Sequence, residues 1–95
     1  PQYYIAKNKI ELSDSSLIDK ILDTVKSRFS DEDINTIDGV KISFESARKW
    51  VHLRRSNTEP IIRIYAEAPS ENEAAALADE VISIAKSCFP SEQAR

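Results

Sequence analysis

The sequence predicts an α+β domain in which two helices pack on one face of a four-stranded, mainly antiparallel sheet. Two segments with helical periodicity, one toward each end of the chain, predict the helices. Four short strand-like segments lie between them, and their tight connections favour antiparallel pairing. The 95 residues suffice for one small domain, and the composition of 41% hydrophobic and 31% charged residues is that of an ordinary globular one.

The first helix is predicted over residues 15–29. It follows a cluster of residues at 13–16 that commonly cap helix N-termini. Apolar residues then recur at helical spacing, namely Ile18, Ile21, Leu22, Val25 and Phe29. An acidic stretch at 31–33 ends the helix. Residues 3–12 before it carry only a weak extended pattern and are not counted among the four strands.

The four strands are predicted at residues 34–37, 40–44, 49–54 and 61–67. The first two flank Asp38-Gly39, a strong signal for a two-residue hairpin turn. Gly39 is the only glycine of the chain, and it stands where such a turn requires a positive φ.

The second helix is predicted to follow Ser70 and to extend to about Phe89. Ser70 and Glu73 have the spacing of a capping box. An apolar stripe of mostly small residues follows, namely Ala74, Leu77, Ala78, Val81, Ala85 and Cys88. Cys88 is the only cysteine, which excludes an internal disulfide, and its place on this stripe predicts buried packing.

Alternation along the strands predicts two different sheet faces. The helix-covered face is expected to carry Val40, Ile42, Phe44, Val51, Leu53, Ile62, Ile64 and Ala66. The open face is expected to carry Trp50, His52, Arg54, Ile61, Arg63, Tyr65 and Glu67. Such residues are either ordinary cross-strand pairs or, alternatively, contacts to another domain that border an active-site cleft. The lone His52 is expected to be packed or hydrogen-bonded rather than catalytic.

Charge is unevenly distributed along the chain. Residues 41–63 hold six cationic and two acidic side chains, a balance of +4, whereas the whole chain is −3. A general nucleic-acid binder is expected to be basic overall, so this pattern better suits one small anion bound at one place. No apolar run approaches membrane-spanning length, and no signal-peptide pattern is present in the sequence.

The segment from Arg54 to Pro60 is the strongest functional motif. Its Ser, Asn and Thr residues suit a turn that leaves backbone N–H groups free to form an anion-binding nest. A nearby arginine adds a planar fork that matches two phosphate oxygens. No acid–base pair, metal cluster or thiol nucleophile accompanies the motif in the sequence. The alternative is a solvated hairpin turn without a ligand.

The string RRSNTEPIIRIYAEA resembles the C-terminal phosphate-binding signature of the α-D-phosphohexomutases, the superfamily of phosphoglucomutase, phosphomannomutase and phosphoglucosamine mutase. The signature positions are filled in order by Arg54, Ser56, Asn57, Thr58, Glu59, Pro60 and Arg63. Arg55 falls on the variable position and is expected to face solvent. Asn57 stands where many members have glycine, and asparagine also tolerates the left-handed conformation. The resemblance implies a TATA-box-binding-protein-like fold.

The resemblance also implies roles for single residues. Arg54, Ser56, Asn57 and Thr58 are expected to bind the phosphate of the substrate. Glu59, Pro60 and Arg63 are expected to support the loop, with Glu59 orienting Arg54 or Arg63. No catalytic residue and no metal ligand is expected in this chain.

A larger parent enzyme is implied as well. The parent would interconvert hexose 1-phosphate and 6-phosphate through a bisphosphate, with a phosphoserine and Mg²⁺ in its first domain. Residues 1–8 are expected to be a remnant of an interdomain linker, residues 9–90 the C-terminal domain, and residues 91–95 a frayed tail. Expected partners are the phosphosugar and the other domains, with no nucleic acid and no membrane, in the cytoplasm. The isolated domain is expected to be inactive, and the sugar stays open.

Two other functions compete with this one. A stand-alone module could bind anions or single-stranded nucleic acid on the open sheet face, using Trp50, Tyr65, Arg54 and Arg63. A structural domain that has lost its anion site is the other alternative.

Overall fold

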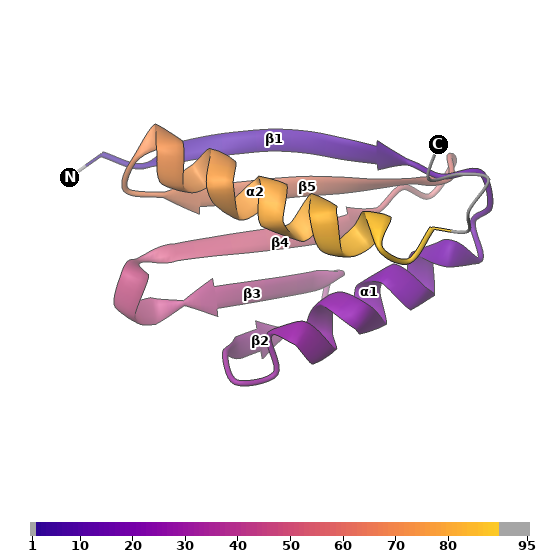
Figure 1. The fold of residues 1–95 in the computed structure, drawn as a ribbon, viewed down its shortest axis with the longest axis horizontal. Helices are drawn as coiled ribbons and strands as arrows, with labels where there is room; N and C mark the ends of the chain where they lie inside the picture. Colours follow the sequence, from indigo (N-terminus) through magenta and orange to yellow (C-terminus); the bar gives the residue numbers. More distant parts are fainter. Residues whose placement is uncertain (1, 90–95) are drawn as a thin grey trace.

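Five antiparallel strands form one sheet, and two helices cover one of its faces (Figure 1). The computed structural model describes residues 2–89, so the predicted tail at 91–95 and the predicted domain end at residue 90 lie outside the described residues. The strands follow the order β1-β5-β4-β3-β2 across the sheet. In chain order the elements are β1 Tyr4–Glu11, α1 Leu17–Arg28, β2 Asp33–Asn35, β3 Val40–Phe44, the short 3₁₀ helix η1 Glu45–Ala47, β4 Lys49–Arg55, β5 Ile61–Ala68 and α2 Glu71–Lys86. The predicted α+β class with helices on one face is confirmed.

The predicted number of strands is wrong by one, because residues 4–11 form the additional edge strand β1. This strand pairs with β5 along its whole length, from Tyr4 opposite Ala68 to Glu11 opposite Ile61. Of its eight side chains only Ile10 is buried, so the sequence shows little alternation there. Residues 4–8, which the sequence analysis assigns to a linker remnant, are therefore paired with β5; their connection to another domain stays a prediction.

Both helices are present, but α2 ends at Lys86, before the predicted end at about Phe89. Helix α1 begins at Leu17 rather than at residue 15, because the Asp14 carboxylate accepts a hydrogen bond from the Ser16 amide at 2.9 Å and holds a turn before the helix. Ser70 caps α2, since its Oγ accepts from the Glu73 amide at 3.2 Å. Its hydroxyl also donates to the Glu73 carboxylate at 2.8 Å.

The hairpin between β2 and β3 is longer than predicted. Strand β2 ends at Asn35, whose side-chain oxygen accepts a hydrogen bond from the Ile37 amide at 2.9 Å, and residues 36–39 form the loop. The predicted positive φ is confirmed at Gly39, where φ is +80°. A Cβ atom at Gly39 would also overlap the carbonyl group of Leu53 on β4. Gly39 thus allows the loop to lie directly against the end of β4 that leads into the candidate site.

The two sheet faces divide largely as the alternation predicts. The fully buried residues of β3, β4 and β5 lie between the sheet and the helices: Ile42, Val51, Leu53, Ile62, Ile64 and Ala66. Cys88, just after α2, is buried in the same core. Ile61 differs, because it has the parity of the open face but is only 5% exposed. In the described part of the chain, neither helix is long and apolar enough to cross a membrane.

Candidate functional site

The loop between β4 and β5 is held at both of its ends. The Ser56 amide donates to the Ile61 carbonyl at 3.1 Å, and the Ile61 amide donates to the Glu59 carbonyl at 2.8 Å. The Leu12 amide donates to the Pro60 carbonyl at 2.8 Å, which ties the loop exit to the segment after β1. These bonds fix the loop backbone without any contact from a ligand.

Polar groups inside the loop are gathered for hydrogen bonding. The Thr58 amide donates to Ser56 Oγ at 3.3 Å, and the two hydroxyl oxygens lie 3.5 Å apart. Within residues 2–89, the amides of Asn57 and Glu59 have no hydrogen-bond partner. Two hydroxyls and two free amides thus lie within four consecutive residues, where they can donate hydrogen bonds to an anion. No residue of this loop has a positive φ, so Asn57 does not adopt the left-handed conformation that its residue type allows.

Arg54, at the start of this loop, is exposed and is contacted by a carboxylate. Its Nε lies 3.3 Å from Oδ2 of Asp38, in the loop between β2 and β3. A nitrogen of the His52 ring also contacts the Asp38 carbonyl oxygen, which agrees with the prediction that His52 is hydrogen-bonded. Glu59 was expected to orient Arg54 or Arg63, but the carboxylate that contacts Arg54 is Asp38, and Glu59 forms no ion pair among residues 2–89. The pairing of β3 with β4 brings Asp38 to Arg54, and this pairing could have indicated the contact.

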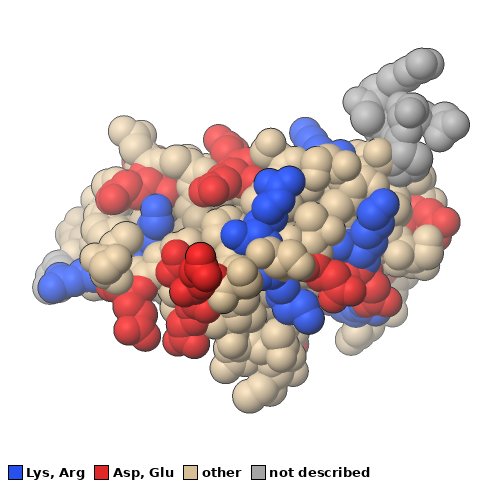
Figure 2. All heavy atoms as spheres, turned by 60° about the horizontal axis from the view of Figure 1, so that its bottom comes forward, with Lys and Arg blue, Asp and Glu red and all other residues tan. Residues whose placement is uncertain are grey.

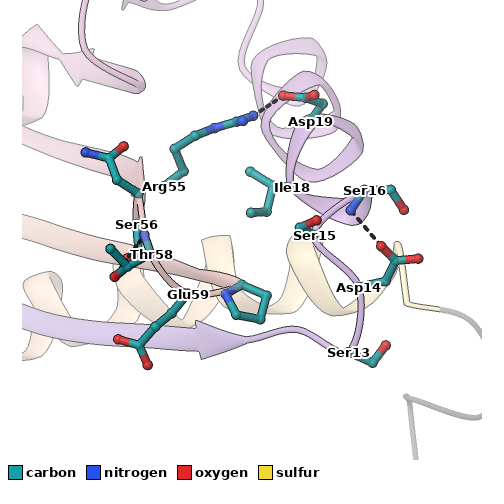
Figure 3. A pocket seen from close by; sticks show the side chains of 12 residues that line it. Ser13, Asp14, Ser15, Ser16, Ile18, Asp19, Arg55, Ser56, Thr58 and Glu59 are labelled. Atoms are coloured by element: carbon teal, nitrogen blue, oxygen red, sulfur yellow. Dashed lines mark hydrogen bonds and ion pairs between the residues drawn. The ribbon is translucent and has the colours of Figure 1, made fainter.

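Arg55 leaves the strand on the opposite side. Its guanidinium forms an ion pair with Asp19 of α1, which Figure 3 shows across the gap between the loop and the helix. The side chain is 47% exposed, so the expectation that it faces solvent omits its main partner. In the same view Thr58 and Glu59 point away from α1. The helix side and the open side of the loop therefore present different groups.

The helix side has a hollow with a volume of about 760 Å³. Loop residues 55–60 and residues 13–19 around the start of α1 line it. Of the charged residues that line it, Asp14, Asp19 and Arg55 lie beside α1, whereas the Glu59 side chain points away from α1. Asp19 already pairs with Arg55. A hydrogen bond from the Ser16 amide stabilises the charged form of the Asp14 carboxyl and so lowers its pKa. Repulsion from these carboxylates disfavours a phosphate in this hollow.

The open side of the loop is cationic. Strand pairing places Arg63 directly opposite Arg54, and both side chains are exposed. Arg63 has no ion pair among residues 2–89. The fold thus brings Arg54, Arg63 and the loop of Ser56, Asn57 and Thr58 to one end of the open sheet face. By contrast, Figure 2 brings the α1 and β2 side of the molecule forward and shows Lys and Arg interspersed with Asp and Glu there.

The described residues do not suit a divalent metal ion. Among them, no group of three or more His, Cys, Asp or Glu side chains is placed to hold one. The Mg²⁺ that the resemblance implies would therefore need ligands from outside residues 2–89.

The sequence matches one family over most of its length. The model for the C-terminal domain of phosphoglucomutase/phosphomannomutase covers residues 8–84. This chain belongs to that family of C-terminal domains, as the signature at Arg54–Pro60 predicted.

Curated relatives extend the comparison. The chain is 37% identical over 90 residues to a "Probable phosphoglucosamine mutase" of Methanopyrus kandleri. The aligned region covers 93% of this chain and 19% of the relative. It is 40% identical over 83 residues to a "Phosphoglucosamine/phosphogalactosamine mutase" of Sulfurisphaera tokodaii, and the aligned region covers 85% of this chain and 18% of that relative. It is also 40% identical over 76 residues to a "Phosphoglucomutase/phosphomannomutase" of Thermococcus kodakarensis, and the aligned region covers 78% of this chain and 16% of that relative. The chain thus spans about a fifth of the length of the relatives it matches.

Proposed function

We propose that this chain is the phosphate-anchoring domain of a phosphohexomutase, an enzyme that interconverts hexose 1-phosphate and hexose 6-phosphate. Membership of the family of C-terminal domains and the mutase names of the relatives support the class of enzyme. The relatives' names include glucosamine, galactosamine, glucose and mannose, so the sugar stays open in this proposal. The partners are a phosphosugar and the other domains of the parent enzyme, in the cytoplasm.

One observation carries the proposal: the loop presents hydrogen-bond donors, two of them amides without an acceptor among residues 2–89, beside an exposed arginine. Free amides at Asn57 and Glu59, hydroxyls of Ser56 and Thr58 and the Arg54 guanidinium lie at one end of the sheet. With Arg54 Nε near Asp38, its terminal nitrogens can form the two parallel bonds of a phosphate fork. Hydrogen bonds to charged groups contribute about 1.5–3 kcal/mol each, before the costs of desolvation and lost motion.

This donor set recognises a phosphate group and contains nothing that reads a sugar. A mutase needs such a site, because either phosphate of the bisphosphate intermediate must occupy it in turn. While one phosphate reacts elsewhere, the loop would hold the other and so orient the reacting end. A phosphoserine and Mg²⁺, supplied by another domain, would provide the phosphoryl-transfer chemistry.

Steady-state kinetics of the parent enzyme would test the proposal. Arg54→Ala should lower kcat/KM about a hundredfold, since two charge-assisted contacts of about 1.5 kcal/mol are lost and 1.36 kcal/mol is a factor of ten. Arg55→Ala is the matched control, because it removes the neighbouring guanidinium from the α1 side. Equal losses in the two variants would refute the assignment of the site to the open side of the loop.

A further inference from the structure

A row of cations crosses the open face of the sheet next to the loop. Strand pairing places Lys9 of β1 opposite Arg63 of β5, and Arg63 opposite Arg54 of β4. Neighbouring strands lie about 4.8 Å apart, so the row is about 10 Å long between its outer Cα atoms. Lys7, two residues before Lys9 on the same face, lies opposite Tyr65 and extends the cationic area by one more row.

These side chains surround a hollow. Its volume is about 560 Å³, and it is lined by Lys7, Asn8, Lys9, Arg63 and Tyr65. The two lysines and Arg63 are exposed, whereas Tyr65 is half-buried between them. The hollow therefore has three cations and a phenol hydroxyl around it and no carboxylate in its lining.

Three cations of this area, Lys7, Lys9 and Arg63, form no ion pair among residues 2–89, whereas Arg54 pairs with Asp38. Three ion pairs form among residues 2–89, and they use the cations of Lys26, Arg54 and Arg55. Lys7, Lys9 and Arg63 take part in none of them. Like charges directly opposite each other on a sheet are destabilising. A bound anion would relieve this repulsion.

We propose that Lys7, Lys9, Arg63 and Tyr65 form a second anion-binding subsite, which takes a phosphate group and is continuous with the loop through Arg54. The proposal rests on the proposed function, because its ligand is the phosphosugar that the loop anchors. A phosphate that leaves the loop meets Arg63 and then Lys9 within about 10 Å. The bisphosphate intermediate thus stays bound by one phosphate while it turns around. This role gives Arg63 a ligand contact in addition to its place in the signature.

Phosphate binding to the 95-residue chain is the first test, measured by ¹H–¹⁵N correlation spectra during titration with inorganic phosphate. In the Arg54→Ala, Ser56→Ala variant, amides of residues 7–9 and 63–65 should still shift while those of the loop no longer respond. In the Lys9→Gln, Arg63→Gln variant the loop should still respond, and the shifts at 7–9 and 63–65 should lose at least two-thirds of their size. The matched control, Lys20→Gln with Lys26→Gln, removes two cations from α1 and should change neither response.

The outcomes separate the two proposals. Loop shifts without open-face shifts would overturn the second subsite and leave the proposed function intact. No response at either place in the wild type would overturn both. A loss of the same size in the α1 control would show general charge screening and would also overturn the subsite.

A second measurement, in the parent enzyme, tests the role of the subsite in turnover. Lys9→Gln with Arg63→Gln should raise the escape of free bisphosphate per turnover several-fold, because the intermediate loses its holding point. If the same variant lowers the melting temperature of the parent and leaves the escape unchanged, the face is a docking surface for an acidic part of another domain. That result would overturn the proposal.

Discussion

Arg54 and Arg55 are neighbours in the chain but belong to different regions of the molecule. Arg55 lies on the helix side, where it pairs with Asp19 and joins the end of β4 to α1. Arg54 lies on the open side, next to Asp38 and opposite another cation, Arg63. Strand alternation alone separates them. Both arginines pair with a carboxylate, but only Arg54 also lies opposite a second cation, and this arrangement favours Arg54 as the proposed phosphate contact.

The two arginines also differ in the charge of the side chains around them. On the helix side, the carboxylates of Asp14 and Asp19 line the hollow together with one cation, Arg55, which Asp19 already pairs. On the open side, three cations without an ion pair among residues 2–89 line the smaller hollow. The sign of the lining charges therefore favours the open side as the proposed phosphate site, although the hollow on the helix side has the larger volume of the two.

The largest effect is expected at Gly39, which allows the Asp38 loop to approach Arg54. Gly39→Val should lower the free energy of unfolding by about 3 kcal/mol or more, because it combines strained backbone with overlap at the Leu53 carbonyl. Urea denaturation of the two chains measures the difference. Gly39→Asn is the control: asparagine tolerates the positive φ, so a variant as stable as the wild type would show that the overlap is absent.

Replacing each arginine by lysine should affect phosphate affinity differently on the two sides of the loop. Arg54→Lys keeps the charge but loses the planar fork, so phosphate affinity should fall about tenfold. Arg55→Lys should leave phosphate affinity unchanged, because its partner is Asp19 on the other side of the sheet. Titration of both variants with a hexose bisphosphate measures the two affinities. A larger loss for Arg55→Lys would reverse the assignment of the two sides.

A smaller effect is expected from the carboxylate on the helix side. Asp19→Asn removes an exposed ion pair, and such pairs contribute about 0.2–1 kcal/mol to stability. Chemical denaturation should show a loss in this range, with unchanged phosphate binding. Stronger phosphate binding in this variant would indicate that the helix-side hollow takes the ligand after all.

The smallest effect concerns Asp14. The hydrogen bond from the Ser16 amide holds its pKa below the ordinary value of 3.8. A depressed pKa stabilises the fold above the unfolded-state pKa, and this contribution disappears as the pH falls through the lower folded-state value. Carboxyl ¹³C titration should therefore give Asp14 a midpoint below 3.8, in contrast to an unfolded peptide of the same sequence. An unshifted midpoint would mean that the turn before α1 is not formed in solution.

Local patterns were sufficient to predict much of the fold. Periodicity indicated both helices, and alternation divided the sheet faces. The only glycine marked one of the two positions of positive φ among residues 2–89, and the other, Arg48, was not predicted. The signature string indicated the family before the comparison showed it. These features depend on residues that are close in sequence, so the sequence of this chain is sufficient to predict them.

Features that depend on distant residues were missed. Strand β1 is stabilised by its pairing with β5, about sixty residues away, and its exposed side chains leave little periodic signal. The pairs of Arg54 with Asp38 and of Arg55 with Asp19 likewise require the strand register and the position of α1. The end of β2 at Asn35 depends on a side-chain bond that competes with the ladder.

The central claim is that the open side of the loop binds phosphate through Arg54. The most direct measurement observes the side-chain Nε–Hε signals of Arg54 and Arg55 in the ¹⁵N-labelled chain during titration with glucose 1,6-bisphosphate. The account predicts a saturable shift of the Arg54 signal, while the Arg55 signal stays in place as long as its pair with Asp19 persists. A saturable shift of Arg55 with an unmoved Arg54 would contradict the account.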